Sequence, residues 1–108
     1  MIDQTTYDKL LAETWETINE LSKKKGGEYA AGDHDRLKNF RRNGERLNLP
    51  MEIIWAVYAG KHWDAVTQYC SDVHTGTNRP RMESLSSRCD DLIVYLILFK
   101  AMLQERGA

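Results

Sequence analysis

The sequence predicts an all-α protein built as a four-helix bundle. Four stretches carry apolar residues at helical spacing, and polar connectors with glycine or proline separate them. The one apolar run that could be a strand has no second strand-like segment with which to pair. At 108 residues the chain is predicted to form one helical domain, residues 1–108, and chains of this size often complete their core with a partner subunit.

The first helix is predicted over residues 6–25. Its inward face is expected to carry Tyr7, Leu10, Leu11, Thr14, Trp15, Ile18 and Leu21, because each residue of a helix turns by about 100°. We expect Thr5 or Thr6 to cap its start. Gly26 and Gly27 are expected to end it, after three lysines that suit a helix C-terminus.

The second helix is predicted over residues 35–48. Leu37, Phe40, Gly44 and Leu47 share its narrow apolar face, and Asp33 or Asp35 is expected to cap its start.

Pro50 is expected to start the third helix, at a position that tolerates its missing N–H. One stripe of about six turns follows, made of Met51, Ile54, Trp55, Tyr58, His62, Ala65, Val66, Tyr69 and Val73. His62 lies near the centre of this stripe, whereas Lys61 and Asp64 fall at or beyond its edge. We expect a connector between residues 74 and 84, which has no periodicity, to link the third helix to the fourth.

The last helix is predicted over residues 85–106. Its middle, LIVYLILF, is apolar on every side, and a helix of this kind needs burial all round. Three neighbouring helices in a small monomer hardly provide that burial. We therefore expect this helix at a subunit interface and the protein to be a homo-oligomer.

Charge and cysteine content limit the partners and the compartment. The formal net charge of −1 gives no overall basic field of the kind that drives non-specific nucleic-acid binding. Cys70 and Cys89 are far apart and sit in apolar helical stretches, which is typical of free thiols in a reducing compartment. The N-terminus has no signal-peptide pattern, and LIVYLILF is too short to span a bilayer. We expect a cytoplasmic protein without a membrane partner.

Carboxylates on two helices form a candidate metal site. Glu13, Glu16 and Glu20 share the first helix, and Asp90 and Asp91 lie near the start of the last. Oxygen ligands in this arrangement can hold Mg²⁺, which can neutralise a phosphate chain and activate water. The alternative is that the three glutamates face solvent and only keep the helix soluble.

His62 has three possible roles on its apolar stripe. It can be a core histidine with a hydrogen bond, a general base, or a phosphate partner when it is protonated. Lys61 adds a cation beside it, and Trp55, Tyr58 and Trp63 offer aromatic surface on which a base could stack.

The last helix opens with Arg88, Asp91 and Tyr95 on one side. Such a triplet can hold a phosphate with the arginine and orient that arginine with the aspartate. It can equally be a salt bridge at the start of a helix without any ligand.

The order of these pieces resembles small helical proteins common in bacteriophage genomes, which are similar in turn to the MazG-like, all-α nucleoside triphosphate pyrophosphohydrolases. The resemblance covers most of the chain and rests on ETWETINE, KKKGGEYAAGDHDRLKNF, KHWDAV and RCDDLIVYLILFKAML. The superfamily carries ExxE on one helix, which Glu13 and Glu16 match, and ExxD before an apolar run with tyrosine, where Asp91 matches the aspartate. Arg88 stands at the place of the second motif's glutamate, and an arginine there would favour phosphate directly.

The resemblance implies a nucleotide-handling protein in the cytoplasm of the host cell. In its catalytic form the protein would bind and hydrolyse a nucleoside triphosphate with Mg²⁺ held by Glu13, Glu16, Glu20 and Asp91. Lys61, His62, Trp55, Tyr58, Arg88 and Tyr95 would then bind the ligand. The alternatives are a non-enzymatic binder that sequesters a nucleotide-like ligand or signal, and an interaction module that modulates a host protein.

Overall fold

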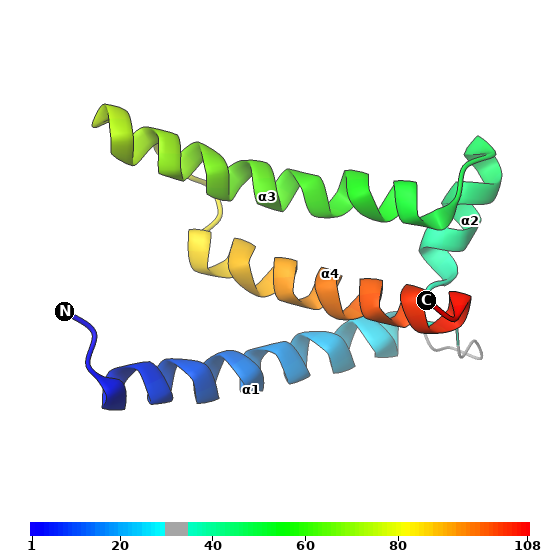
Figure 1. Ribbon diagram of the computed structural model, residues 1–108, viewed down its shortest axis with the longest axis horizontal. Helices are drawn as coiled ribbons and strands as arrows, with labels where there is room; N and C mark the ends of the chain where they lie inside the picture. The colour runs from blue at the N-terminus through cyan, green and yellow to red at the C-terminus, as the bar shows by residue number, and fades with distance from the viewer. Residues whose placement is uncertain (30–34) are drawn as a thin grey trace. The chain divides into compact units, whose positions relative to one another are not determined.

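The computed structural model describes residues 1–29 and 35–108. In these ranges it contains no strand and four helices, α1 (Gln4–Tyr29), α2 (Lys38–Leu47), α3 (Met51–Thr75) and α4 (Leu85–Arg106) (Figure 1). The prediction of an all-α chain with four helices is therefore confirmed. Contacts divide the chain into two compact units, Met1–Arg36 and Leu37–Ala108. None of these helices, within the described residues, is long and apolar enough to cross a membrane.

The first unit contains α1, which is longer than predicted at both ends. Its start is capped by Asp3, whose Oδ1 accepts a hydrogen bond from the backbone N–H of Thr6 at 2.8 Å. The predicted cap at Thr5 or Thr6 is therefore wrong. The predicted end at residues 26–27 is also wrong, because α1 continues to Tyr29. Each glycine costs a helix about 1 kcal/mol relative to alanine, and a long helix can carry that cost because elongation adds one hydrogen bond per residue.

The second unit opens with α2, which starts three residues later than predicted. Leu37 occupies the N-cap position, where its apolar side chain makes no capping hydrogen bond. Asp35 lies two residues before this position, and its predicted role as the cap stays a prediction. The alternative cap, Asp33, lies outside the described residues.

A tight turn joins α2 to α3. Asn48 adopts a left-handed conformation with φ of 55°, and the N–H of Leu49 donates to the carbonyl of Gly44 at 2.8 Å. A Cβ on Gly44 would lie 2.6 Å from the carbonyl oxygen of Leu49, closer than real contacts allow. Glycine is therefore required at position 44, and the turn lets Pro50 precede α3 directly, as predicted.

The helices α3 and α4 run antiparallel and side by side, and α2 crosses at one end of the pair (Figure 1). α4 has the predicted bounds. Its first turn is capped by Ser84, whose Oγ accepts from the N–H of Ser87 at 3.0 Å, and Gly107 ends it with φ of 74°.

The core of the second unit lies where these three helices meet. Its buried members are Leu37, Phe40, Met51, Ile54 and Met102, with Trp55, Tyr95, Leu98 and Phe99 packed against them. Trp55 fixes the register of α3 against α4: its ring stacks on Phe99 with centroids 4.6 Å apart, and its Nε1–H donates to the Tyr95 carbonyl at 2.7 Å.

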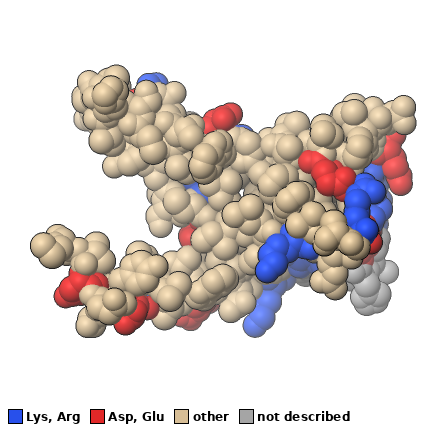
Figure 2. Space-filling view, viewed as in Figure 1, with Lys and Arg blue, Asp and Glu red and all other residues tan. Residues whose placement is uncertain are grey.

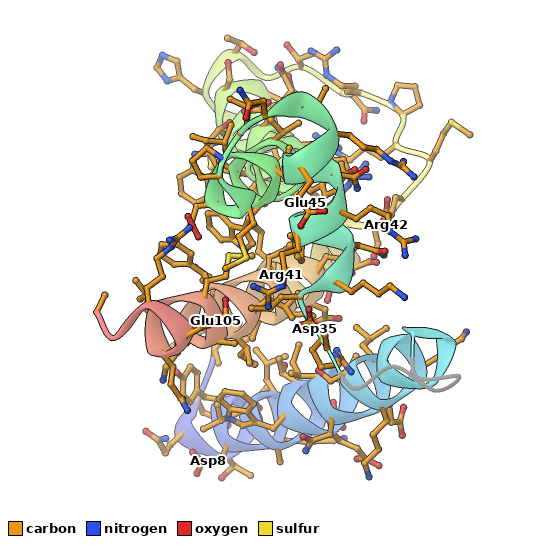
Figure 3. All side chains as sticks on the ribbon, turned by 90° about the vertical axis from the view of Figure 1, so that its right-hand side faces the viewer. Asp8, Asp35, Arg41, Arg42, Glu45 and Glu105 are labelled. Carbon is orange, nitrogen blue, oxygen red and sulfur yellow. The ribbon has the colours of Figure 1, made fainter. Side chains whose placement is uncertain are left out.

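Charged side chains gather at the end of the second unit where α2 lies, toward the right of Figure 2, while the face over most of α3 is largely neutral. Arg41 of α2 donates two hydrogen bonds of 2.7 Å to Glu105 of α4, and the two side chains point toward each other in Figure 3. Arg106 donates likewise to Glu52, at 2.9 and 3.0 Å. These paired forks tie the end of α4 to both neighbouring helices.

The apolar middle of α4 is only partly covered. Val94 is buried, whereas Leu96 and Ile97 are 54% and 42% exposed. The subunit interface expected on this helix therefore remains a prediction, and the exposed apolar face of the helix supports it.

Candidate functional site

The best-defined polar cluster of the second unit lies between α3 and the first turns of α4. Its centre is His62, which is only 5% exposed. Arg88 Nη1 lies 3.0 Å from His62 Nδ1, and Asp91 Oδ2 lies 3.7 Å from the same nitrogen. The ring of Tyr95 packs against the imidazole with centroids 5.5 Å apart. Four of the residues singled out from the sequence are thus brought together.

The contacts of His62 define its protonation state. A guanidinium can only donate, so Nδ1 accepts from Arg88 and the ring proton sits on Nε2. The longer contact to Asp91 then involves no donated proton. Burial lowers the pKa of His62 below its ordinary value of 6.5, against the opposing effect of Asp91. His62 is therefore a neutral, buried imidazole that orients the guanidinium of Arg88.

Further carboxylates surround the start of α4. Glu83 Oε2 lies 3.3 Å from Arg88 Nη2, so this arginine is held from two sides. Burial, with the negative charge of Asp91 next to it, raises the pKa of Asp90.

The connector between α3 and α4 is ordered around Asp72, a carboxylate on the last turns of α3 with a side chain only 4% exposed. It accepts from Arg79 Nε at 2.9 Å, Arg79 Nη2 at 3.1 Å, Arg81 Nη2 at 3.1 Å and Gln68 Nε2 at 3.1 Å. The hydrogen bonds from Arg79 lower the pKa of Asp72. Arg81 also lies over the ring of Tyr69, with its Cζ 5.0 Å from the centroid.

Sequence reasoning missed Asp72, Arg79 and Arg81 as a group. The segment 74–84 was expected to be only a connection, because it lacks periodicity. The available signal was the RPR triplet following an aspartate at the end of an apolar helix. Only the folded chain shows that the segment turns back along α3.

A recess of about 170 Å³ lies between this connector and the cluster around His62. It is lined by Ala65, Gln68, Arg79, Arg81, Met82, Glu83, Leu85 and Arg88. Arg88 belongs to both features, since its two Nη atoms contact His62 and Glu83 while its side chain lines the recess. The recess therefore places three guanidinium groups around a space that is large enough for a small anion.

The other predicted ligand residues lie apart from this recess. Trp55 is part of the core, as described above. Tyr58 packs against Phe40 with ring centroids 6.1 Å apart, and its hydroxyl lies 3.4 Å from Asn43 Nδ2. Lys61 is exposed and does not line the recess.

The predicted metal ligands belong to different units. Glu13, Glu16 and Glu20 are exposed on α1, where Glu13 lies 3.8 Å from Lys9. Asp91 belongs to the second unit, beside His62. In the part of the chain that the structure describes, no three His, Cys, Asp or Glu side chains are grouped to hold a metal ion. The expectation of Mg²⁺ stays a prediction.

An apolar groove of about 350 Å³ lies elsewhere on the α3–α4 pair. It is lined by Trp55, Ala56, Ala59, Gly60, Trp63, Leu92 and Leu96. Trp63 on its rim is 60% exposed. Trp63 and Gln68 point about 140° apart around α3 at 100° per residue, so the groove and the recess open on different sides of this helix.

No protein-family model matches the chain, and no curated protein or solved structure is significantly similar to it.

Proposed function

We propose that this protein binds a nucleotide-like, phosphate-bearing ligand at the face formed by His62, Arg88 and the recess beside them, and that it holds the ligand without hydrolysing it. The observation that carries the proposal is the position of Arg88, whose guanidinium lines the recess while a buried neutral histidine orients it. A guanidinium fixed in this way can donate to a phosphate in a planar, bidentate geometry.

The resemblance to the MazG-like superfamily supports the ligand class. Its second acidic motif would place a glutamate at position 88, where this chain has arginine. That exchange removes a candidate metal ligand and adds a direct phosphate donor. In addition, the histidine at 62 accepts a hydrogen bond from this arginine, so its Nδ1 is not available as a general base. The resemblance also suggests that the protein acts in the cytoplasm of a phage-infected host.

Calorimetric titration of nucleoside mono- and triphosphates, with a chelator present, tests the proposal. The wild type is expected to bind, and Arg88→Ala is expected to weaken binding about tenfold or more, since a hydrogen bond to a charged group contributes about 1.5–3 kcal/mol. The matched control is Arg42→Ala, which removes an exposed arginine of α2. Binding of no nucleotide, or equal affinity in Arg88→Ala, would contradict the proposal.

The catalytic alternative predicts a different product. With Mg²⁺ at high protein concentration, a pyrophosphohydrolase would convert nucleoside triphosphate to monophosphate and pyrophosphate, which anion-exchange chromatography separates. We expect no conversion. If the wild type did show turnover and Glu16→Gln abolished it, the protein would be an enzyme that uses the acidic helix α1, and the proposal of a non-hydrolysing binder would be wrong.

A second candidate function is a protein-interaction module that modulates a host protein. The groove with Trp63 on its rim favours it, because exposed tryptophan is typical of interface hot spots. If no nucleotide binds in the titrations, this function becomes the stronger candidate.

A further inference from the structure

We infer that Arg79 and Arg81 of the connector between α3 and α4, together with Arg88 of α4, form a phosphate cradle. The cradle binds the terminal phosphate group of the ligand and makes no contact that distinguishes one base from another. The inference rests on the proposed function and narrows it. It gives the connector residues Arg79 and Arg81 a binding role beyond that of a link between helices.

The first support is the number of donors left over. An arginine has five N–H donors. Arg79 uses Nε and Nη2 on Asp72, Arg81 uses Nη2 on Asp72 and Nη1 on a backbone carbonyl, and Arg88 uses its two Nη atoms. Within residues 1–29 and 35–108, no acceptor contacts Nη1 of Arg79 or Nε of Arg81 and Arg88. Each of the three guanidinium groups can therefore still donate to a ligand.

The second support is preorganisation. Asp72 is buried, and the four donors around it match the four acceptor positions of a carboxylate. It therefore fixes Arg79 and Arg81 before any ligand arrives, while His62 and Glu83 fix Arg88. A ligand then gains hydrogen bonds without the cost of ordering three flexible side chains.

The third support is the charge balance. The recess is lined by three guanidinium groups and by one carboxylate, that of Glu83. With Asp72, which pairs with two of the arginines from outside the lining, these groups carry one net positive charge. Asp72 lies behind the arginines that it holds: its side chain is 4% exposed, whereas those of Arg79 and Arg81 are 49% and 28% exposed. The side of the recess open to solvent is therefore dominated by donors, which favours an anion.

Size and geometry restrict which part of the ligand enters. The recess of about 170 Å³ is smaller than the roughly 300–1,000 Å³ typical of sites for drug-sized ligands. It can hold a phosphate group but not a whole nucleotide. The apolar groove that could take a base opens on a different side of α3, and Arg81 already lies over the ring of Tyr69. We therefore expect similar affinity for nucleotides that differ only in the base.

Pyrophosphate and inorganic phosphate are the probes for a direct test, by calorimetry without any divalent metal. Both are expected to bind, and pyrophosphate is expected to compete with nucleotides. The double variant Arg79→Lys, Arg81→Lys keeps the charges that neutralise Asp72 but loses the planar fork. It is expected to weaken pyrophosphate binding about tenfold or more, the loss of about 1.4 kcal/mol, whereas the control Arg42→Lys stays within about twofold.

A spectroscopic readout covers the case in which the double variant does not fold, which thermal unfolding followed by circular dichroism would reveal. In the wild-type protein, pyrophosphate is expected to shift the side-chain ¹⁵N–¹H signals of Arg79, Arg81 and Arg88 together. No binding of pyrophosphate, or a shift of Arg88 alone, would overturn the cradle.

The two proposals fail differently. If nucleotides bind and need Arg88 but bind equally well to the double lysine variant, the cradle is wrong and the proposed function stands. If pyrophosphate binds at the three arginines and nucleotides do not displace it, the three arginines form a site for simple phosphates, and both the proposed function and the assignment of the site to a nucleotide's terminal phosphate fail.

Discussion

At the scale of single residues, His62 decides how Arg88 is presented. Its neutral imidazole accepts from the guanidinium at 3.0 Å, so a proton added to Nδ1 would turn an acceptor into a donor facing a cation. Of the charged groups around the ring, Asp91 and Glu83 raise the pKa of His62, whereas Arg88 and Lys61 lower it. Protonation of His62 would therefore break its bond to Arg88 and favour Asp91 as the new partner.

This arrangement predicts a stability loss in mild acid. The fold lowers the pKa of His62 below 6.5, so the unfolded chain binds the proton more readily than the folded one. The contribution of neutral His62 is fully present above pH 6.5 and is lost as the pH falls through the lowered pKa in the folded protein. Urea unfolding measured between pH 7.5 and pH 5 should show a decreasing free energy of unfolding.

The control for this prediction is His62→Gln, because glutamine can still accept from Arg88 but does not titrate. The difference in free energy of unfolding between wild type and variant should depend on pH in this window. A constant difference would show that His62 is not the group responsible.

At the scale of elements, the α2–α3 turn requires a residue without a side chain at position 44, which is Gly44. An alanine at position 44 would place its Cβ 2.6 Å from the Leu49 carbonyl oxygen, which is part of the backbone and cannot rotate away. We predict that Gly44→Ala lowers the free energy of unfolding by about 1–3 kcal/mol, the usual cost of overpacking. Urea denaturation measures this change.

Gly60 provides the matched control within α3. A Cβ there would meet no atom within 4 Å, and alanine is favoured over glycine in a helix by about 1 kcal/mol. Gly60→Ala is therefore expected to leave stability unchanged or to raise it. A loss in Gly60→Ala equal to that in Gly44→Ala would contradict the role given to the turn.

Among the elements, α3 and α4 were predictable because their periodic stripes are long and their end signals are local. Pro50 and the polar connector mark their bounds in the sequence itself. The end of α1 was not predictable in the same way, since the glycine pair 26–27 is weakly helical and does not force a stop. The cap of α2 depended on where its first turn begins, which the sequence left open between Asp33 and Asp35.

At the scale of the whole molecule, the exposed apolar face of α4 predicts self-association. Leu96 and Ile97 are 54% and 42% exposed, and apolar surface of this kind is costly to leave in water. Analytical ultracentrifugation should show a species larger than the 12.5 kDa monomer.

The variant Leu96→Gln, Ile97→Gln is expected to shift this species toward the monomer while the helix content by circular dichroism stays the same. Arg42→Gln, on the exposed surface of α2, serves as the control. A wild-type protein that sediments as a monomer at all concentrations would contradict the predicted subunit interface.

The sequence by itself determined that the chain forms four helices, that His62 is buried and that Arg88 and Asp91 lie on one side of α4, because each follows from a repeat of 3.6 residues within one helix. Only the tertiary structure decided what His62 faces and what the connector does. The bonds from Arg79 and Arg81 to Asp72 span seven and nine residues across a segment without periodicity. Such contacts depend on how the chain turns back in space, and a local sequence pattern carries no signal for that turn.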